Sequence, residues 1–173
     1  ELKLEIKDAV QTFNYQVNTL QTSNGQSPFL SVCIYLNENP EYTKEVAMLA
    51  EEFFKQRLDG MKNKFGIKAT QTFPKLLYFL DENNTYEGSE YFYLTKLAVQ
   101  CTALRMNPDY MSVKKHMELK GVCTPSMGCR ALLSPWVNPE TNKLQTWGRG
   151  NLGVQSLNLP YIAMENNPNR SEE

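Results

Sequence analysis

Apolar residues recur along the chain with two different periods, and the two periods alternate. Spacings of three and four residues place apolar side chains on one face of a helix. They predict helices at residues 2–20, 41–64 and 89–105. Short apolar runs rich in branched and aromatic residues indicate buried strands. These runs lie at residues 29–36, 73–80 and 130–137. Strands that alternate with helices predict an α/β fold with parallel strand pairs.

Polar segments rich in Gly, Pro and Asn separate these elements. The connection over residues 105–129 is the longest, and its periodicity is weak. In a compact domain, a connection of this length is usually functional or mobile. After the strand at 130–137, a turn with hairpin character predicts a returning strand at 144–147. A Gly-rich turn and an alternating strand then lead to a helix that opens at Pro160, because proline suits the first turn of a helix.

Composition narrows the classes of function. The chain has 173 residues, enough for one domain with a hydrophobic core, and its 18 basic and 19 acidic residues leave a net charge of -1. No basic face is concentrated enough to predict a nucleic-acid partner. No apolar run approaches the ~20 residues that cross a membrane, so no membrane partner is expected. The four scattered cysteines do not form a secreted disulfide framework, which predicts a cytoplasmic protein. The abrupt helical start and polar end suggest a piece of a longer protein.

The stretch "CTPSMGCRALLSP" (123–135) contains two of the four cysteines. Cys33 and Cys101 lie in apolar segments and are expected to be buried. Cys123 and Cys129 are separated by five residues, and no second ligand pair follows, so a zinc site is disfavoured. A redox pair, one reactive thiol at Cys129, or a buried cysteine at a strand start all remain open. From the residues alone, the buried cysteine is favoured.

Three other features carry weaker signals. His116, the single histidine, lies in a charged stretch that predicts a solvated surface. The segment "GRGNLG" (148–153) does not have its third glycine at the spacing that a dinucleotide-binding fingerprint requires. Asn151 within it either caps a turn or offers its amide to a ligand hydroxyl. The Asn-Gly pair of "SNGQSPF" (23–29) predicts a turn. Backbone N–H groups there could instead bind phosphate.

Three blocks occur in a fixed order: "NTLQTSNGQSPF", "SMGCR" and "GRGNLGVQSLNLPYIA". In this order and spacing, they resemble the anaerobic (class III) ribonucleoside-triphosphate reductases, which are glycyl-radical enzymes. The resemblance covers nearly the whole chain. It implies that residues 1–173 form a central segment of the family's ten-stranded α/β barrel, with a finger loop at about 121–131. The family's glycyl-radical domain and its N-terminal ATP cone are expected to lie outside this segment.

The resemblance also implies a reaction and its residues. In this family a glycyl radical takes a hydrogen atom from a cysteine at the tip of the finger loop. The resulting thiyl radical removes the ribose 3′ hydrogen, and the 2′ hydroxyl is then lost. The matching cysteine is Cys129. Met127 matches the methionine beside it in formate-using members, and Asn151 matches the asparagine that contacts the ribose hydroxyls. Substrate contacts are expected at Asn24, Gly25, Gln26, Ser27, Gly128 and Arg149. No metal ligand is expected.

These residue types suit hydrogen-atom transfer. The S–H bond of a thiol is the weakest covalent bond to hydrogen that a side chain offers, and a dry pocket keeps the thiol protonated. Methionine is a polarizable neighbour that does not titrate. Asparagine donates to and accepts from a hydroxyl without adding charge.

The resemblance further implies the reductant and the partners of the complete enzyme. No cofactor is expected within residues 1–173. The complete enzyme would use a glycyl radical, installed by an S-adenosylmethionine/iron-sulfur activating protein, and formate. A ribonucleoside triphosphate substrate, dNTP and ATP effectors, and a second copy in a homodimer are the other expected partners. Two alternatives are a non-catalytic nucleotide-binding fragment and a thiol redox protein that uses Cys123 and Cys129. A pyruvate formate-lyase-type enzyme is disfavoured, because that group uses adjacent cysteines.

Overall fold

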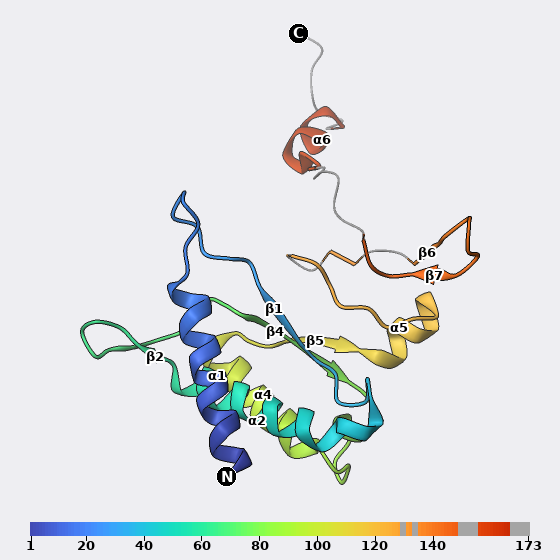
Figure 1. Cartoon of the computed structure of the whole chain (residues 1–173). Coiled ribbons are helices and arrows are strands. Elements are labelled where there is room, and N and C mark those ends of the chain that lie inside the picture. The colour runs from blue at the N-terminus through green and yellow to red at the C-terminus, as the bar shows by residue number, and fades with distance from the viewer. Residues whose placement is uncertain (129–130, 133–134, 149–155, 167–173) are drawn as a thin grey trace. The chain divides into compact units, whose positions relative to one another are not determined.

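A computed structural model describes residues 1–128, 131–132, 135–148 and 156–166 (Figure 1). The chain divides into two compact units, Glu1–Pro135 and Trp136–Glu173. The first unit is built around a parallel sheet with strand order β1-β4-β5. Its strands are β1 (Ser31–Ile34), β4 (Lys75–Leu80) and β5 (Asp109–Ser112). The α/β class is therefore confirmed, and the ten-stranded barrel stays a prediction.

Two helices, α2 (Thr43–Asp59) and α4 (Phe92–Arg105), cover one face of this sheet (Figure 1). Helix α1 (Leu2–Thr19) packs against α2. Successive side chains of a strand point to opposite faces. Leu76 and Tyr78 of β4 therefore pack with Phe54 of α2 and Leu94 of α4, while the intervening Leu77 belongs to a cluster on the other face. We call that other face the open face of the sheet. Its buried residues are Leu77, Phe79 and Met111.

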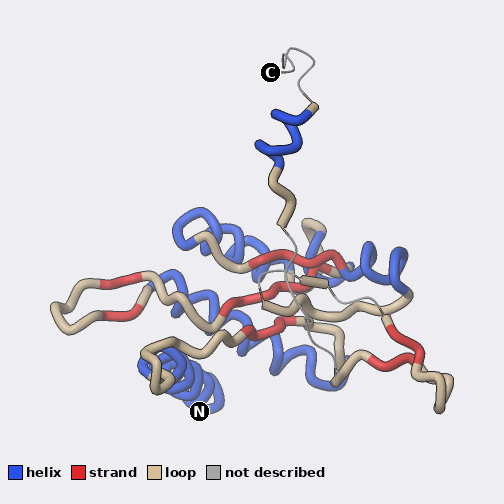
Figure 2. The backbone as a smooth tube through the Cα atoms, turned by 90° about the horizontal axis from the view of Figure 1, so that it is seen from above, coloured by secondary structure: helices blue, strands red, loops and turns tan. Residues whose placement is uncertain are grey.

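Helix α2 ends at Asp59, five residues before the predicted end at residue 64. The reason is Gly60, which has φ +75° and lies so close to Ala69 that a Cβ would be 2.8 Å from its carbonyl oxygen. The chain then forms an antiparallel hairpin of β2 (Met61–Lys62) and β3 (Lys68–Ala69), which projects from the first unit (Figure 2).

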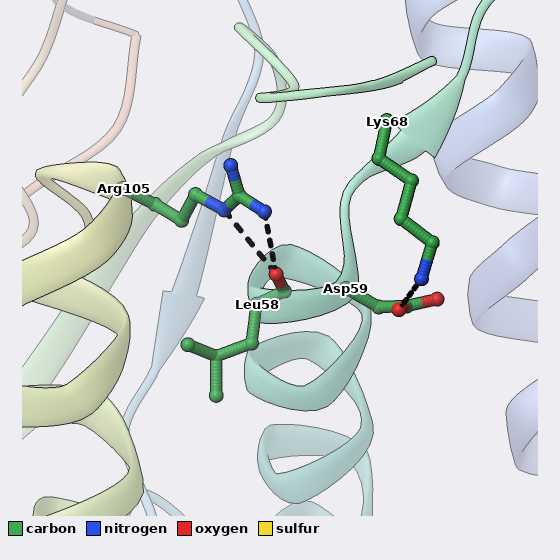
Figure 3. A network of polar contacts seen from close by, with 4 residues as sticks. All are labelled: Leu58, Asp59, Lys68 and Arg105. Atoms are coloured by element: carbon green, nitrogen blue, oxygen red, sulfur yellow. Dashed lines mark hydrogen bonds and ion pairs between the residues drawn. The ribbon is translucent and has the colours of Figure 1, made fainter. Parts of the chain in front are cut away.

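Polar contacts join the end of α2 to α4 and to this hairpin (Figure 3). The Arg105 Nε and Nη2 atoms donate hydrogen bonds to the Leu58 carbonyl oxygen, at 3.2 and 2.8 Å. Lys68 forms an ion pair with Asp59 at the last residue of α2. The carbonyl at the end of α2 is thus satisfied by a cation from α4, a favourable arrangement at a helix C-terminus.

The connection after residue 105 is more ordered than expected. It contains β5 and α5 (Val113–Lys120), and neither was predicted. Strand β5 has four residues with a mixed polar pattern, "DYMS", and it forms because β4 pairs with it in register. Helix α5 begins at Ser112, whose hydroxyl accepts a hydrogen bond from the Lys115 N–H. Two short elements complete this unit: η1 (Pro40–Tyr42) and α3 (Glu82–Thr85).

The second unit contains a hairpin and a helix. Strands β6 (Trp136–Val137) and β7 (Leu144–Gln145) pair antiparallel, which confirms the predicted hairpin turn. The predicted strand at 130–137 is observed only at its last two residues, and residues 130, 133 and 134 lie outside the described part. Helix α6 (Leu159–Glu165) begins around Pro160, as predicted, with Asn158 as its N-cap. No helix in the described ranges is long and apolar enough to span a bilayer.

Helix α4 is followed by Met106, and a substitution there is expected to stabilise the protein. Met106 caps it with φ 57°, in the left-handed region, and its side chain is 87% exposed. Glycine adopts this conformation without the Cβ penalty. We expect Met106→Gly to raise the free energy of unfolding by about 0.5–1 kcal/mol, measured by urea denaturation.

The matched control lies two residues earlier. Leu104 is also exposed but has helical neighbours on both sides. Leu104→Gly should lower the free energy of unfolding by roughly 1 kcal/mol, because glycine costs that much inside a helix. A Met106→Gly protein that is less stable than the parent would contradict the prediction.

Candidate functional site

The segment that follows α5 returns across the open face of the sheet. Cys123 packs against the cluster of Leu77, Phe79 and Met111. Ser126, which is 8% exposed, and Leu132 line a cavity of about 720 Å³ whose floor includes residues of β4 and β5. A volume of this size is typical of ligand pockets. Residues 121–128, the described first part of the predicted finger loop, therefore lie over the face of the sheet opposite α2 and α4.

The chain reverses direction within this segment. The Met127 N–H donates to the Ala131 carbonyl at 2.8 Å, and the Ala131 N–H donates to the Met127 carbonyl at 3.0 Å. Gly128 has φ +52°, which favours glycine at the start of the turn. Met127 is 37% exposed beside it. Cys129, the predicted radical position, is one of the residues between these partners and lies outside the described residues.

The cavity also contains charged and titratable groups that the sequence did not single out. The Lys75 ammonium and Asp109 carboxylate form an ion pair at 2.7 Å, with side chains only 17% and 18% exposed. Asp109 lines the cavity. Sequence reasoning missed this pair because its two members, 34 positions apart, meet only through the pairing of β4 with β5.

His116 lines the same cavity, so the prediction that it lies on a solvated surface was wrong. Helix α5 turns it toward the open face of the sheet and leaves it half-buried. Burial, together with the nearby Lys120 ammonium, lowers the pKa of the His116 imidazole. Its Nδ1 atom is buried and has no hydrogen-bond partner among the described residues. The imidazole is therefore neutral at neutral pH.

The described cysteines have three different environments. Cys101 is buried, as predicted, and desolvation raises the pKa of its thiol to about 11. Cys33 is exposed, which contradicts the prediction of burial. The pleat of β1 places Ile34 against the helices and Cys33 on the open face. Cys123 is half-buried, and burial raises the pKa of its thiol, so it is a weak nucleophile at neutral pH.

The second predicted contact region, residues 24–27, forms a closed turn. Its backbone N–H groups are used internally. The Gly25 N–H donates to the Thr22 carbonyl at 2.8 Å, and the Gln26 N–H donates to the Thr22 hydroxyl at 3.1 Å. The side chains of Asn24, Gln26 and Ser27 are exposed. Any ligand would therefore meet these side chains rather than the two amides.

Contacts at the edge of the sheet connect the segment after this turn to the cavity. The Phe29 and Phe73 rings lie 5.0 Å apart in an edge-on arrangement. The Lys75 N–H donates to the Leu30 carbonyl at 2.7 Å, and the Lys75 side chain reaches Asp109 in the cavity lining. These contacts link Phe29 and Leu30, which follow the turn in sequence, to the cavity through the first residue of β4. Arg149 and Asn151, the other predicted site residues, lie outside the described residues. In the described ranges, no group of three His, Cys, Asp or Glu residues could hold a metal ion.

Comparison with known proteins decides the family. The profile of the family described as anaerobic ribonucleoside-triphosphate reductase matches residues 1–172. The chain belongs to the anaerobic ribonucleoside-triphosphate reductase family. The resemblance of the three sequence blocks is thereby confirmed.

Curated members of the reductase family are similar over nearly the whole chain. The anaerobic ribonucleoside-triphosphate reductase of Enterobacteria phage T4 is 38% identical over 164 residues, covering 93% of this chain and 26% of that protein. The reductase of Escherichia coli K12 is 36% identical over 163 residues, covering 93% of this chain and 22% of that protein. The Salmonella typhimurium reductase is 34% identical over a similar range. The chain therefore spans about a quarter of the length of these relatives.

Proposed function

We propose that this chain is the catalytic-barrel segment of an enzyme that reduces ribonucleoside triphosphates to deoxyribonucleoside triphosphates. The observation that carries the proposal is the family match over residues 1–172. The Met127–Ala131 turn over the open face of a parallel sheet is consistent with it, because the turn adjoins a cavity of ligand size. Since the chain covers about a quarter of its relatives, the activity belongs to the complete polypeptide.

In this proposal, the Cys129 sulfur exchanges one hydrogen atom with the ribose. The thiyl form of Cys129 takes the 3′ hydrogen, which restores the thiol and leaves a carbon radical on the sugar. The 2′ hydroxyl leaves with a proton as water, and C2′ gains a hydrogen at the expense of two electrons from formate. The Cys129 thiol then returns its hydrogen atom to C3′, which regenerates the thiyl radical. Asn151 holds the ribose hydroxyls through its amide, which can donate and accept without titrating. Arg149, Gly128 and residues 24–27 provide further substrate contacts.

Formate is the proposed source of the two electrons, and it is oxidised to carbon dioxide. A glycyl radical elsewhere in the complete enzyme, installed by an S-adenosylmethionine/iron-sulfur activating protein, supplies the starting radical. Effector binding by dNTP or ATP and assembly as a homodimer in the cytoplasm complete the proposal. Support for these finer points is the resemblance of the Met-Gly-Cys block and its surroundings to formate-using members.

The direct test is turnover by the complete polypeptide that carries this segment. After anaerobic activation, it should convert a ribonucleoside triphosphate to the deoxy product and release one carbon dioxide from labelled formate per product. Nucleotide binding without any deoxy product would refute the proposal and favour a non-catalytic segment. The thiol redox alternative predicts a disulfide between Cys123 and Cys129. The raised pKa of the Cys123 thiol counts against that alternative.

Met127 provides a sharper test of the reductant. In the complete enzyme, Met127→Gln should lower formate-dependent turnover by roughly tenfold or more, because an amide replaces the polarizable thioether beside the radical site. The measured quantity is labelled carbon dioxide per minute at saturating nucleotide. Met117→Gln, a matched change at an exposed methionine of α5 that does not line the cavity, should leave the rate unchanged. Undiminished formate oxidation in Met127→Gln would contradict the role of this residue.

A further inference from the structure

The segment between α1 and β1 carries the turn at residues 22–27 and is held at both of its ends. The chain leaves the end of α1, makes the turn and returns into β1 (Figure 1). In the described part of the chain, the hydrogen bonds of residues 21–28 stay within the turn. The position of the turn therefore depends strongly on the contacts made just before it and just after it.

The contact before the turn comes from Asn18, in the last turn of α1. The Asn18 Nδ2 atom donates to the Phe73 carbonyl at 2.6 Å and to the Asn14 carbonyl at 2.7 Å. The first of these bonds joins the end of α1 to a residue 55 positions later in the sequence. Both hydrogens of the amide are used, so the two bonds fix the orientation of the side chain.

The contact after the turn reaches the same residue. The Phe29 ring meets the Phe73 ring edge-on, with 5.0 Å between the ring centroids. Aromatic pairs of this kind contribute beyond the area that they bury. The Lys75 N–H donates to the Leu30 carbonyl one position further along. Phe73 therefore contacts the chain on both sides of the turn, because its carbonyl binds Asn18 and its ring packs on Phe29.

Phe73 is itself fixed to the helix layer. The buried Arg57 guanidinium of α2 donates hydrogen bonds to the carbonyls of Gln71 and Pro74, on either side of Phe73. The residue after Pro74 begins β4, the central strand of the sheet. Groups that bind a ligand are held most precisely when rigid elements and hydrogen bonds support them. Phe73 provides such a support for the turn.

We propose that Phe73 and Asn18 are positioning residues for the turn at residues 22–27. They hold its two ends, so that the exposed side chains of residues 24–27 meet a nucleotide in one arrangement. The inference rests on the proposed function, because it takes residues 24–27 as substrate contacts. A turn released from these contacts must be ordered when the nucleotide binds, which weakens binding. Such a loss raises KM and leaves kcat unchanged.

The experiment measures kcat and the KM for CTP in the complete, activated enzyme. Phe29→Leu and Phe73→Leu each remove the ring pair, and each should raise KM by about three- to tenfold while kcat changes by less than about twofold. The double variant should cost no more than the worse single change, because both remove the same contact. Phe73→Tyr keeps the ring and should keep KM within about twofold of the parent.

Hydrogen–deuterium exchange follows the turn directly. In Phe73→Leu and Asn18→Ala, the amide hydrogens of Gly25 and Gln26 should exchange faster than in the parent, because the turn opens more often. Asn18→Ala should raise KM as well. The matched control is Phe13→Leu, which removes the ring pair between α1 and Phe53 of α2. It should lower stability and leave both the KM for CTP and the exchange of the turn unchanged.

The outcomes are distinct. A KM within about twofold of the parent in both Phe29→Leu and Phe73→Leu overturns the inference, even if exchange rises. Losses that multiply in the double variant overturn it too, and so does a Phe13→Leu variant that raises KM equally, because that result shows a general loss of structure. If Phe73→Leu does not fold, Phe29→Leu and Asn18→Ala decide. A parent that makes no deoxynucleotide would refute the proposed function instead, and the Kd of the unactivated variants for CTP would then decide the inference in place of KM.

Discussion

Replacing Cys129 by alanine in the complete enzyme should abolish formation of deoxynucleotide, a loss of at least roughly a thousandfold. Alanine offers only strong C–H bonds, so it can neither give up a hydrogen atom to form a radical nor take one from the ribose. The measurement is the initial rate of deoxynucleotide formation after anaerobic activation. Electron paramagnetic resonance of the same samples should show the glycyl radical of the proposed function at the parental level.

Cys123 is the matched control for this experiment. It lies six positions earlier and is half-buried against Leu77, Phe79 and Met111. Its thiol packs as an apolar group in the structure, so Cys123→Ala should retain the parental rate once the amount of folded protein is equal. Activity that survives Cys129→Ala but disappears in Cys123→Ala would reverse the assignment of the two cysteines.

The largest effect on stability is expected at Arg57. Its guanidinium is 1% exposed, and it donates hydrogen bonds to the carbonyls of Gln71 and Pro74 in the segment before β4. Burial lowers the pKa of this guanidinium. Arg57→Met keeps most of the volume but leaves both carbonyls without a donor, at about 1–3 kcal/mol each. We expect the free energy of unfolding to fall by about 3 kcal/mol.

Urea denaturation of the chain measures this loss. Lys55→Met is the control, because it removes an exposed cation of the same helix that pairs with Glu51. Exposed ion pairs contribute little, so its effect should stay within about 0.5 kcal/mol. An Arg57→Met protein as stable as the Lys55→Met protein would show that the two carbonyls find other partners.

Arg57 also bears on the candidate site. It holds the segment that leads into β4, and Lys75, the first residue of that strand, contacts both Leu30 and Asp109. Loss of the arginine should therefore weaken the position of Lys75 at the edge of the cavity as well as the packing of the core.

The amino-acid sequence was sufficient for the strongly periodic elements. Helices α1, α2 and α4 and strands β1 and β4 were predicted from apolar spacing, because burial of one helix face, or of a whole strand, constrains every apolar position within it. The order of three short blocks was sufficient for the family. The assignments of Cys129, Asn151 and Arg149 also come from those blocks, and they stay predictions because these residues lie outside the described part of the chain.

Tertiary structure alone decided the remaining features. Strand β5 has no apolar period of its own and forms because β4 offers it a paired edge. Cys33 is exposed, and His116 lines a cavity, because the pleat and the helix turn set the direction of each side chain relative to a face that only packing defines. The pair of Lys75 and Asp109 exists because parallel pairing brings distant strand starts together. Such contacts depend on register between segments, and no local pattern of residues records that register.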